Sequence, residues 1–170
     1  LLKRLSDAIE DNDNIQAVID GWGVNQDGKT NGITAPNPES QTQLQQNIYD
    51  KFAIEPESIQ LIEAHGTGTK LGDPIEIEGL KNSFKKYTDK TQYCALGSVK
   101  SNIGHCLTAA GIASVTKVVM ALKHKKLPPT INYSKLNEHI DLQGSPFFIN
   151  ESLQDWSVSK GKTRRAAVSS

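Results

Sequence analysis

The 170-residue sequence predicts an α/β fold built on a largely parallel β-sheet. Segment 58–64, with Ile59, Leu61 and Ile62, and segment 93–99 read as strands buried on both faces. Segments 39–52, 72–86 and 106–123 carry apolar residues at helical spacing and alternate with those strands along the chain. Strands that alternate with helices favour βαβ units around a parallel sheet.

Each helix has its own signal. Segment 39–52 carries Leu44, Ile48 and Phe52 at four-residue spacing, which indicates an amphipathic helix. The next helix starts strongly, with Asp73 as the expected N-cap, Pro74 at the first helical position and Glu76 completing a capping-box-like pair. Its core-facing stripe is expected at Ile77, Leu80 and Phe84.

The third helix, 106–123, is rich in small residues at its start, and Pro128-Pro129 ends it. One face of it is expected to carry Leu107, Gly111, Val115, Val118 and Leu122. Segment 16–20 also reads as a short strand, and so does 166–170 at the other end. Because natural termini are more often polar, we expect a piece of a longer polypeptide.

Charge and composition favour a cytoplasmic protein. The 19 basic and 19 acidic residues balance, and no basic stripe suggests a nucleic-acid partner. The longest mostly apolar run, 112–122, contains polar residues and is too short to cross a membrane. The two cysteines, Cys94 and Cys106, suggest reduced thiols rather than a disulfide scaffold.

Residues 23–30 read GVNQDGKT and match the pattern of a phosphate-binding loop. A working loop of that type opens directly into a helix, whose first N–H groups hold the phosphates. Here Gly32, Pro36 and Pro38 follow, and these residues disfavour that helix. We therefore do not expect a nucleotide site.

Other candidate sites are also incomplete. Neither cysteine has a second ligand at zinc spacing, so no metal site is expected. Residues 11–14 resemble the start of a calcium loop, but Gln16 stands where that loop needs glycine. Gly66-x-Gly68 lacks the third glycine of a dinucleotide fingerprint. Cys106 beside His105 would point away from it on a helix, and we expect this cysteine to serve packing.

Two histidines stand where the buried strands end. His65 follows segment 58–64, and His105 follows segment 93–99 with Lys100 between. Parallel sheets place their ligands at the carboxyl ends of strands, so we expect both histidines in one site. Imidazole can donate a hydrogen bond to a developing oxyanion and exchange a proton near neutral pH. His105 is also expected to open a helix, whereas His124 and His139 read as solvated.

These motifs resemble the β-ketoacyl synthase family. Residues 63–69, EAHGTGT, followed by 72–76, GDPIE, look like its first histidine motif. Residues 98–105, SVKSNIGH, followed by 109–111, AAG, look like the second, and PPTIN at 128–132 resembles the loop that follows. The stretch 24–37 is similar to another ketosynthase loop, so the phosphate-loop match is accidental. The resemblance is strongest to ketosynthase domains of modular polyketide synthases.

The resemblance implies a layered αβαβα thiolase-like fold, usually a homodimer, of which residues 1–170 form a partial domain, roughly its C-terminal half. The implied reaction is decarboxylative Claisen condensation in polyketide or fatty acid biosynthesis. An acyl thioester on a cysteine meets malonyl carried on the phosphopantetheine arm of an acyl carrier protein. No bound cofactor and no metal are implied.

By the same resemblance His65, His105 and Lys100 are catalytic, and Thr67, Thr69 and Asn102 contact substrate. The family's nucleophilic cysteine belongs to a segment upstream of Leu1, and its glycine-rich loop would begin just after Ser170. Two alternatives stay open. One is a non-elongating module that binds or transfers acyl chains or serves dimerisation. The other is a thiolase, which does not decarboxylate its extender.

Overall fold

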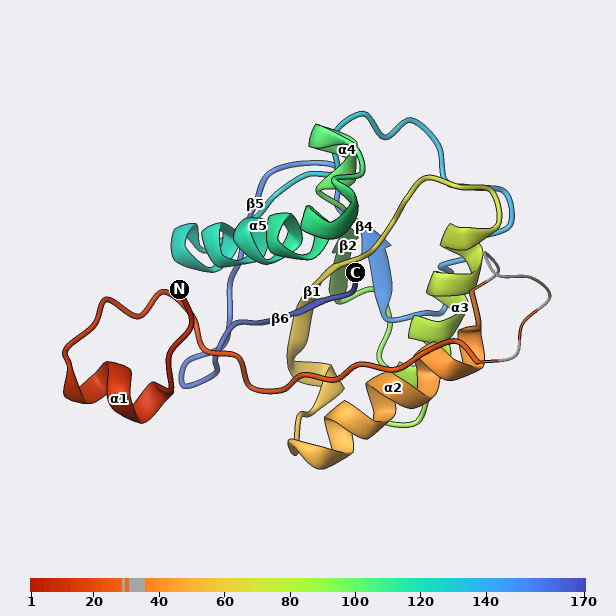
Figure 1. Cartoon of the computed structure of the whole chain (residues 1–170). Helices are drawn as coiled ribbons and strands as arrows, with labels where there is room; N and C mark the ends of the chain where they lie inside the picture. Colours follow the sequence, from red (N-terminus) through yellow and green to blue (C-terminus); the bar gives the residue numbers. More distant parts are fainter. Residues whose placement is uncertain (29, 31–35) are drawn as a thin grey trace.

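The computed structural model describes residues 1–28, 30 and 36–170, and a four-stranded parallel sheet lies at its centre (Figure 1). The strand order is β4-β2-β1-β6, and each neighbouring pair is parallel, which confirms the predicted sheet type. The strands are β1 (Ile59–Glu63), β2 (Cys94–Gly97), β4 (Phe147–Ile149) and β6 (Arg165–Val168). A separate antiparallel pair joins β3 (Lys126–Leu127) and β5 (Gln154–Asp155).

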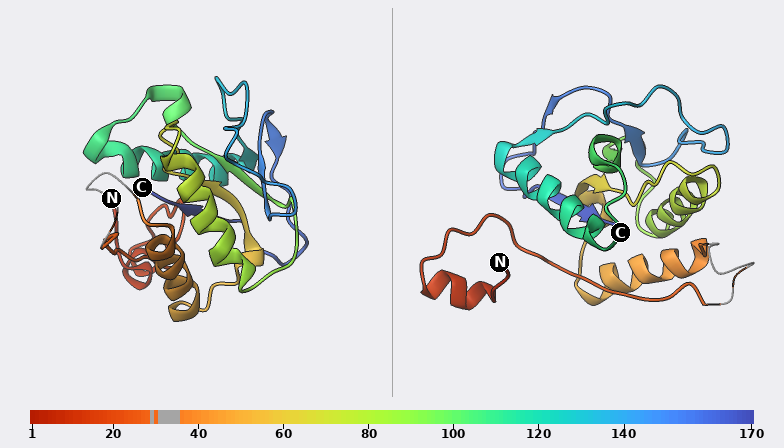
Figure 2. Two further views of the ribbon diagram at one scale, coloured as in Figure 1. Left: turned by 90° about the vertical axis from the view of Figure 1, so that its right-hand side faces the viewer. Right: turned by 45° about the horizontal axis from the view of Figure 1, so that its top comes forward.

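Helices cover both faces of the sheet (Figure 2). Helices α2 (Pro38–Lys51) and α3 (Gly72–Lys85) pack on one face, and α5 (Ala110–His124) packs on the other. Shorter elements connect them: α1 (Leu5–Glu10), α4 (Lys100–Ile103) and the 3₁₀ turns η1 (Pro56–Ser58) and η2 (Leu107–Ala109). The three layers follow from strands that are apolar on both sides.

Alternating side chains of each strand enter two different cores. Ile62 of β1 faces α2 and α3, where Phe84 is fully buried and meets the Phe147 ring edge-to-face at a centroid distance of 4.9 Å. Leu61, its neighbour, faces α5 and packs with buried Trp156. The period-two geometry of a strand thus fastens both helical layers to one sheet.

Helix α2 begins at Pro38 and is capped by Asn37, whose side-chain oxygen accepts the N–H groups of Glu39 and Ser40. The Asn37 amide also donates to the Asp27 carbonyl at 2.8 Å. Among the described residues, the first helix after GVNQDGKT therefore starts only at the second proline, Pro38. Residues 29 and 31–35 of the loop lie outside the described residues.

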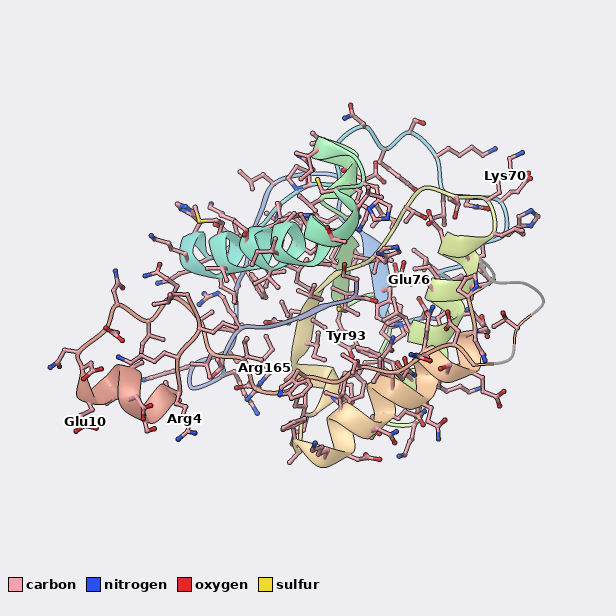
Figure 3. The ribbon with its side chains drawn as sticks, in the orientation of Figure 1. Arg4, Glu10, Lys70, Glu76, Tyr93 and Arg165 are labelled. Carbon is pink, nitrogen blue, oxygen red and sulfur yellow. The ribbon has the colours of Figure 1, made fainter. Side chains whose placement is uncertain are left out.

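The predicted strand at 16–20 is wrong. The segment runs extended, but no backbone hydrogen bond of the described residues joins it to β6 or to another strand. Val18 and Ile19 are exposed, and Asp20 forms an ion pair with Arg165 of β6, a residue labelled in Figure 3. A strand needs a hydrogen-bonding neighbour, and an apolar pattern does not supply one.

The start of the third helix and part of its buried face differ from prediction, while Val118 and Leu122 do pack against the sheet. A positive φ of 50° at Leu107 and the turn η2 come first, so α5 begins at Ala110 instead of residue 106. Its buried residues are Ala110, Ser114, Val118 and Ala121. Small side chains let the helix approach the sheet, while Leu107 and Val115 remain exposed. None of the described helices is long and apolar enough to serve as a membrane span.

Candidate active site

The two histidine motifs meet at the carboxyl edge of the sheet. β1 and β2 are parallel neighbours, with Glu63 opposite Gly97 in register, so the loops that follow them start side by side. The rings of His65 and His105 lie 5.3 Å apart between centroids and meet at 87°, edge to face. Residues 40 positions apart in the sequence are thus brought into one site.

His65 is held neutral by its surroundings. The side chain is half-buried, and burial lowers its pKa from the ordinary 6.5, followed by the charges of Lys100 and His105. Its Nδ1 is buried and finds no hydrogen-bond partner within the described ranges. A neutral imidazole in this position keeps one N–H available for donation.

His105 has a defined tautomer. Its Nδ1 accepts the backbone N–H of Leu107 at 3.2 Å, so the proton of the neutral ring resides on Nε2. The ring is exposed, and Gly104 before it has a φ of 75°. Contrary to expectation, His105 does not open a helix: it stands between α4 and η2, and α5 starts five residues later. A helix dipole therefore gives no account of its chemistry.

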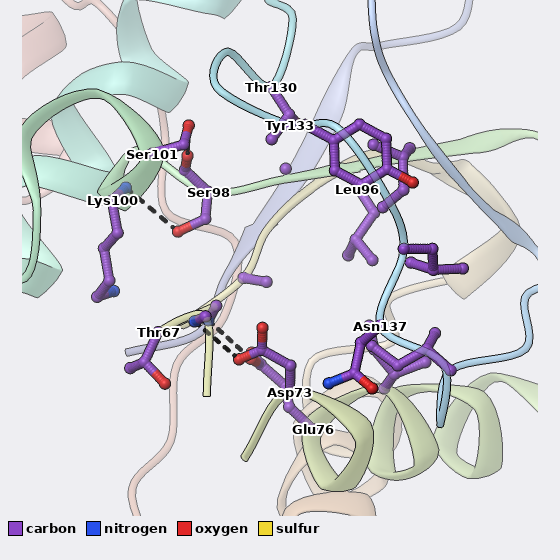
Figure 4. Close-up of a pocket in the computed structure, with 18 of the residues that line it drawn as sticks. Thr67, Asp73, Glu76, Leu96, Ser98, Lys100, Ser101, Thr130, Tyr133 and Asn137 are labelled. Atoms are coloured by element: carbon purple, nitrogen blue, oxygen red, sulfur yellow. Dashed lines mark hydrogen bonds between the residues drawn. The ribbon is translucent and has the colours of Figure 1, made fainter. Parts of the chain in front are cut away.

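Carboxylates of α3 hold the His65 loop. Both oxygens of Glu76, which is labelled in Figures 3 and 4, accept backbone N–H groups at 2.8 Å, one from His65 and one from Gly66. Asp73 accepts the N–H of Gly68 at 3.1 Å. Burial raises the pKa of Glu76, and the two donated N–H groups oppose that rise. The Glu76 side chain of α3 thereby fixes a loop that precedes this helix in the chain.

This arrangement corrects the predicted capping. The N-cap position of α3 is Leu71, whose own side chain makes no capping hydrogen bond. The Thr69 hydroxyl instead accepts the N–H of Gly72 at 3.1 Å. Asp73 and Glu76 have capping-box spacing but face the loop, because its N–H groups point inward and need acceptors.

Lys100 is the first residue of α4 and belongs to the turn that leads to His105. Its side chain is 9% exposed, and Nζ has no hydrogen-bond partner in the part of the chain that the structure describes. It contributes to lowering the pKa of His65. Its charge also opposes the rise that burial causes in the pKa of Glu63 and of Glu76. Lys100 therefore acts electrostatically on the site.

A cavity of about 560 Å³ adjoins the His65 loop (Figure 4). Its walls come from the loop after β1, from residues 96–101 and from the segment 130–142. Lys100 and Ser98 lie on one side of it and Asn137 on the other (Figure 4). The floor is apolar, formed by Ile77, Leu96 and Ile149 among others.

The expected substrate contacts are distributed around this loop. Thr67 is half-buried and lines the cavity, and its hydroxyl is 3.2 Å from that of exposed Thr69. Asn102 is exposed on α4, with Oδ1 3.3 Å from the Ser101 hydroxyl. Thr67 and Thr69 thus belong to the loop of His65 and Asn102 to the turn before His105, and their roles remain predictions.

The cysteines and the other histidines stay outside the His65–His105 pair. Cys94 is fully buried in β2, and burial raises the pKa of its thiol. Cys106 is half-buried with Sγ 3.9 Å from the Gly104 carbonyl. His124 and His139 are exposed, as expected, although His139 lines the rim of the cavity.

Sequence reasoning missed three charged residues that support the site: Glu63, Glu76 in its loop-holding role, and Lys117 of α5. Glu63 is fully buried, and its carboxylate lies 2.6 Å from Lys117 Nζ. A charged residue inside an otherwise apolar strand was the available signal, because a buried charge needs a partner.

Comparison with known proteins identifies the family of this chain. The family model described as "Beta-ketoacyl synthase, C-terminal domain" matches residues 16–134. The chain therefore belongs to the β-ketoacyl synthase family, and it is a C-terminal part of a ketosynthase domain.

Relatives and solved structures are polyketide synthases. The chain is 55% identical over its whole length to polyketide synthase PksL of Bacillus subtilis, covering 4% of that protein. It is 48% identical over its whole length to polyketide synthase PksN of the same organism, covering 3%. The chain thus spans only a small part of the length of these relatives.

Two solved structures superpose closely. The ketosynthase from module 6 of the bacillaene synthase of Bacillus subtilis 168 is 54% identical, with a TM-score of 0.96 over 98% of this chain and 30% of the other. Ketosynthase twelve of the Bacillus amyloliquefaciens bacillaene synthase is 47% identical, with a TM-score of 0.94 over 99% and 30%. The thiolase-like fold is confirmed.

Proposed function

We propose that the ketosynthase domain containing this chain catalyses decarboxylative Claisen condensation. In the malonyl thioester, the bond between the carboxylate and the α-carbon breaks and CO₂ leaves. The electron pair of the broken bond stays with the thioester and forms an enolate. The α-carbon then attacks an acyl thioester held on a cysteine, a carbon–carbon bond forms, and the cysteine thiolate departs. That cysteine would come from another part of the domain.

The facing pair of histidines carries this proposal. Decarboxylation develops negative charge on the thioester oxygen, and neutral imidazoles can donate hydrogen bonds to it. His105 has its proton on Nε2, and the lowered pKa of His65 keeps that ring neutral. One such donor is typically worth about 10²–10³ in rate. The positive charge of Lys100 would help to keep the His65 ring neutral.

The substrate would arrive as a thioester on the phosphopantetheine arm of an acyl carrier protein. Thr67, Thr69 and Asn102 are the residues proposed to contact it, and no cofactor or metal would reside in the site. The rest of the domain would cover the exposed apolar side chains Leu107 and Ile112. A cytoplasmic homodimer is the proposed assembly.

The test uses the complete ketosynthase domain with malonyl carried on an acyl carrier protein. We expect CO₂ release and chain extension by the wild type, and a loss of about 10²–10³ in CO₂ release for His105→Ala. His124→Ala, in an exposed histidine at the end of α5, is the matched control. Acyl transfer without CO₂ release by the wild type would instead identify a non-elongating module.

A further inference from the structure

We infer that Lys117 of α5 is a positioning residue for the histidine site and acts through the carboxylate of Glu63. The inference rests on the proposed function and adds to it a residue outside both histidine motifs. It is carried by an ion pair, a backbone hydrogen bond and the position of Glu63 between the two loops.

Glu63 joins three elements at the carboxyl edge of the sheet. It is the last residue of β1, two residues before His65, and its exposed fraction is 0%. One oxygen accepts the backbone N–H of Val99, the residue directly before Lys100. The other oxygen lies 2.6 Å from Nζ of Lys117. One side chain thus ties the loop of the first motif to the turn of the second.

Lys117 reaches this carboxylate from α5, which covers the face of the sheet opposite to α2 and α3. Its side chain is 13% exposed and passes close to Gly97, where an added Cβ would lie 3.5 Å from Nζ. The same Cβ would meet the Thr130 hydroxyl at 3.0 Å. A Cβ at Gly97 would thus be in ordinary contact with Nζ and tight only against Thr130, so the Lys117 ammonium lies directly against the end of β2.

The charges make this pair matter for the site. Burial raises the pKa of Glu63, and Lys117, the Val99 N–H and Lys100 oppose that rise in this order. The charged groups that face Glu63 are thus Lys117 from α5 and Lys100 from α4. A buried carboxylate without its partner takes up a proton more readily. A protonated Glu63 holds the Val99 N–H less strongly, because neutral acceptors form weaker hydrogen bonds.

Lys117→Met in the complete domain is the first variant. We expect kcat for malonyl decarboxylation to fall by about 10- to 100-fold at neutral pH, as for a site displaced by a fraction of an ångström, with little change in KM. Because Glu63 then protonates at higher pH, the rate should recover as pH rises. Lys123→Met, an exposed lysine on the same helix, should behave like the wild type in both respects.

The double variant Glu63→Gln/Lys117→Met separates positioning from general stability. If Lys117 acts through Glu63, the double variant loses no more activity than Glu63→Gln alone, and the recovery at high pH disappears. Lys117→Met with the wild-type kcat and pH profile but a lower melting temperature would overturn the inference and leave a structural ion pair.

A readout independent of activity keeps the two proposals apart. Hydrogen–deuterium exchange of residues 98–105 should speed up in Lys117→Met and stay unchanged in Lys123→Met, because the Val99 N–H loses its charged acceptor. Absence of CO₂ release by the wild type would contradict the proposed function. Unchanged exchange in Lys117→Met would contradict the positioning role, whatever the wild-type activity.

Discussion

Glu76 receives two consecutive backbone N–H groups, from His65 and from Gly66, each at 2.8 Å on a separate carboxylate oxygen. The loop between β1 and α3 is therefore fastened at the histidine itself. A buried carboxylate that accepts several N–H groups is an effective clamp, since hydrogen bonds to a charged acceptor are stronger than neutral ones. The conformation of His65 depends on this side chain of α3.

Glu76→Gln should loosen the histidine loop. The amide keeps one acceptor oxygen but turns an NH₂ group toward an N–H, so one buried donor loses its partner. We expect a loss of about 1–3 kcal/mol in the free energy of unfolding, and slower malonyl decarboxylation. Thermal denaturation and CO₂ release of the complete domain measure both effects. Glu78→Gln, on the exposed side of the same helix, is the control and should change neither. A wild-type rate for Glu76→Gln would show that the clamp is dispensable.

The acidic limb of the pH–rate profile should respond to Lys100. Burial and the charges of Lys100 and His105 lower the pKa of His65, so the ring stays neutral below its ordinary 6.5. Lys100→Met removes one of these charges, and the pKa of His65 should rise toward 6.5 without reaching it, because burial remains. As the pH is lowered, the decarboxylation rate of Lys100→Met should therefore begin to fall at a higher pH than that of the wild type. A profile displaced to lower pH would contradict this electrostatic role.

The same shift makes a stability prediction with a definite sign. Because the pKa of folded His65 is lowered, the unfolded chain binds more protons between the folded value and 6.5. The contribution of His65 to stability is thus present above 6.5 and is lost as pH falls through that window. In Lys100→Met the window narrows, so the melting temperature should fall less on acidification. Melting curves between about pH 5 and pH 8 measure it, a range in which histidine titrates.

The helices and strands whose own residues carry a clear apolar pattern could be predicted from the sequence. β1 and β2 are short, mostly apolar segments, and α2 and α3 carry apolar residues at regular helical spacing. The strand expected at 16–20 failed because pairing depends on a neighbour that its own residues do not encode. The predicted face of the third helix was right at Val118 and Leu122, which pack against the sheet, and wrong at the exposed Leu107. Small residues such as Ala110 and Ala121 are buried beside them, because they let the helix come close to the sheet.

Within the site too, features with a local sequence pattern could be predicted, and features that depend on distant contacts could not. Both histidines were predictable because they follow buried strands, and parallel strands end at one edge. The roles of Glu63 and Lys117 depend on contacts across layers, between residues 54 positions apart in the sequence. Glu76 has the spacing of a capping box, yet its partners precede the helix, and spacing alone cannot tell these two uses apart.

Gly66 should be the least replaceable glycine of the histidine loop. Its φ is 47°, and an added Cβ would lie 2.8 Å from Cβ of Ser98. Gly144 has a φ of 68° with open space around it, so it isolates the cost of the backbone conformation. We expect Gly144→Ala to cost about 1–2 kcal/mol, and Gly66→Ala to cost clearly more and to lower decarboxylation. Equal losses in unfolding free energy would show that the contact with Ser98 relaxes freely.

Asn37 joins the loop that contains GVNQDGKT to the sheet-covering helix α2. Its side-chain oxygen caps the helix by accepting the N–H groups of Glu39 and Ser40, and its amide donates to the Asp27 carbonyl at 2.8 Å. Asn37→Ala removes both contacts, and we expect a loss of about 1 kcal/mol or more in the free energy of unfolding, the usual value of a helix cap.

Asn37→Ser distinguishes the two contacts, because serine retains a capping oxygen but cannot reach the Asp27 carbonyl with an amide. If the cap dominates, Asn37→Ser should keep most of the stability that Asn37→Ala loses in thermal denaturation. Gln43→Ala, an exposed position on α2, should stay close to the wild type because alanine suits a helix. Equal losses for serine and alanine would instead assign the stabilisation to the hydrogen bond with Asp27, and so to the anchoring of the loop.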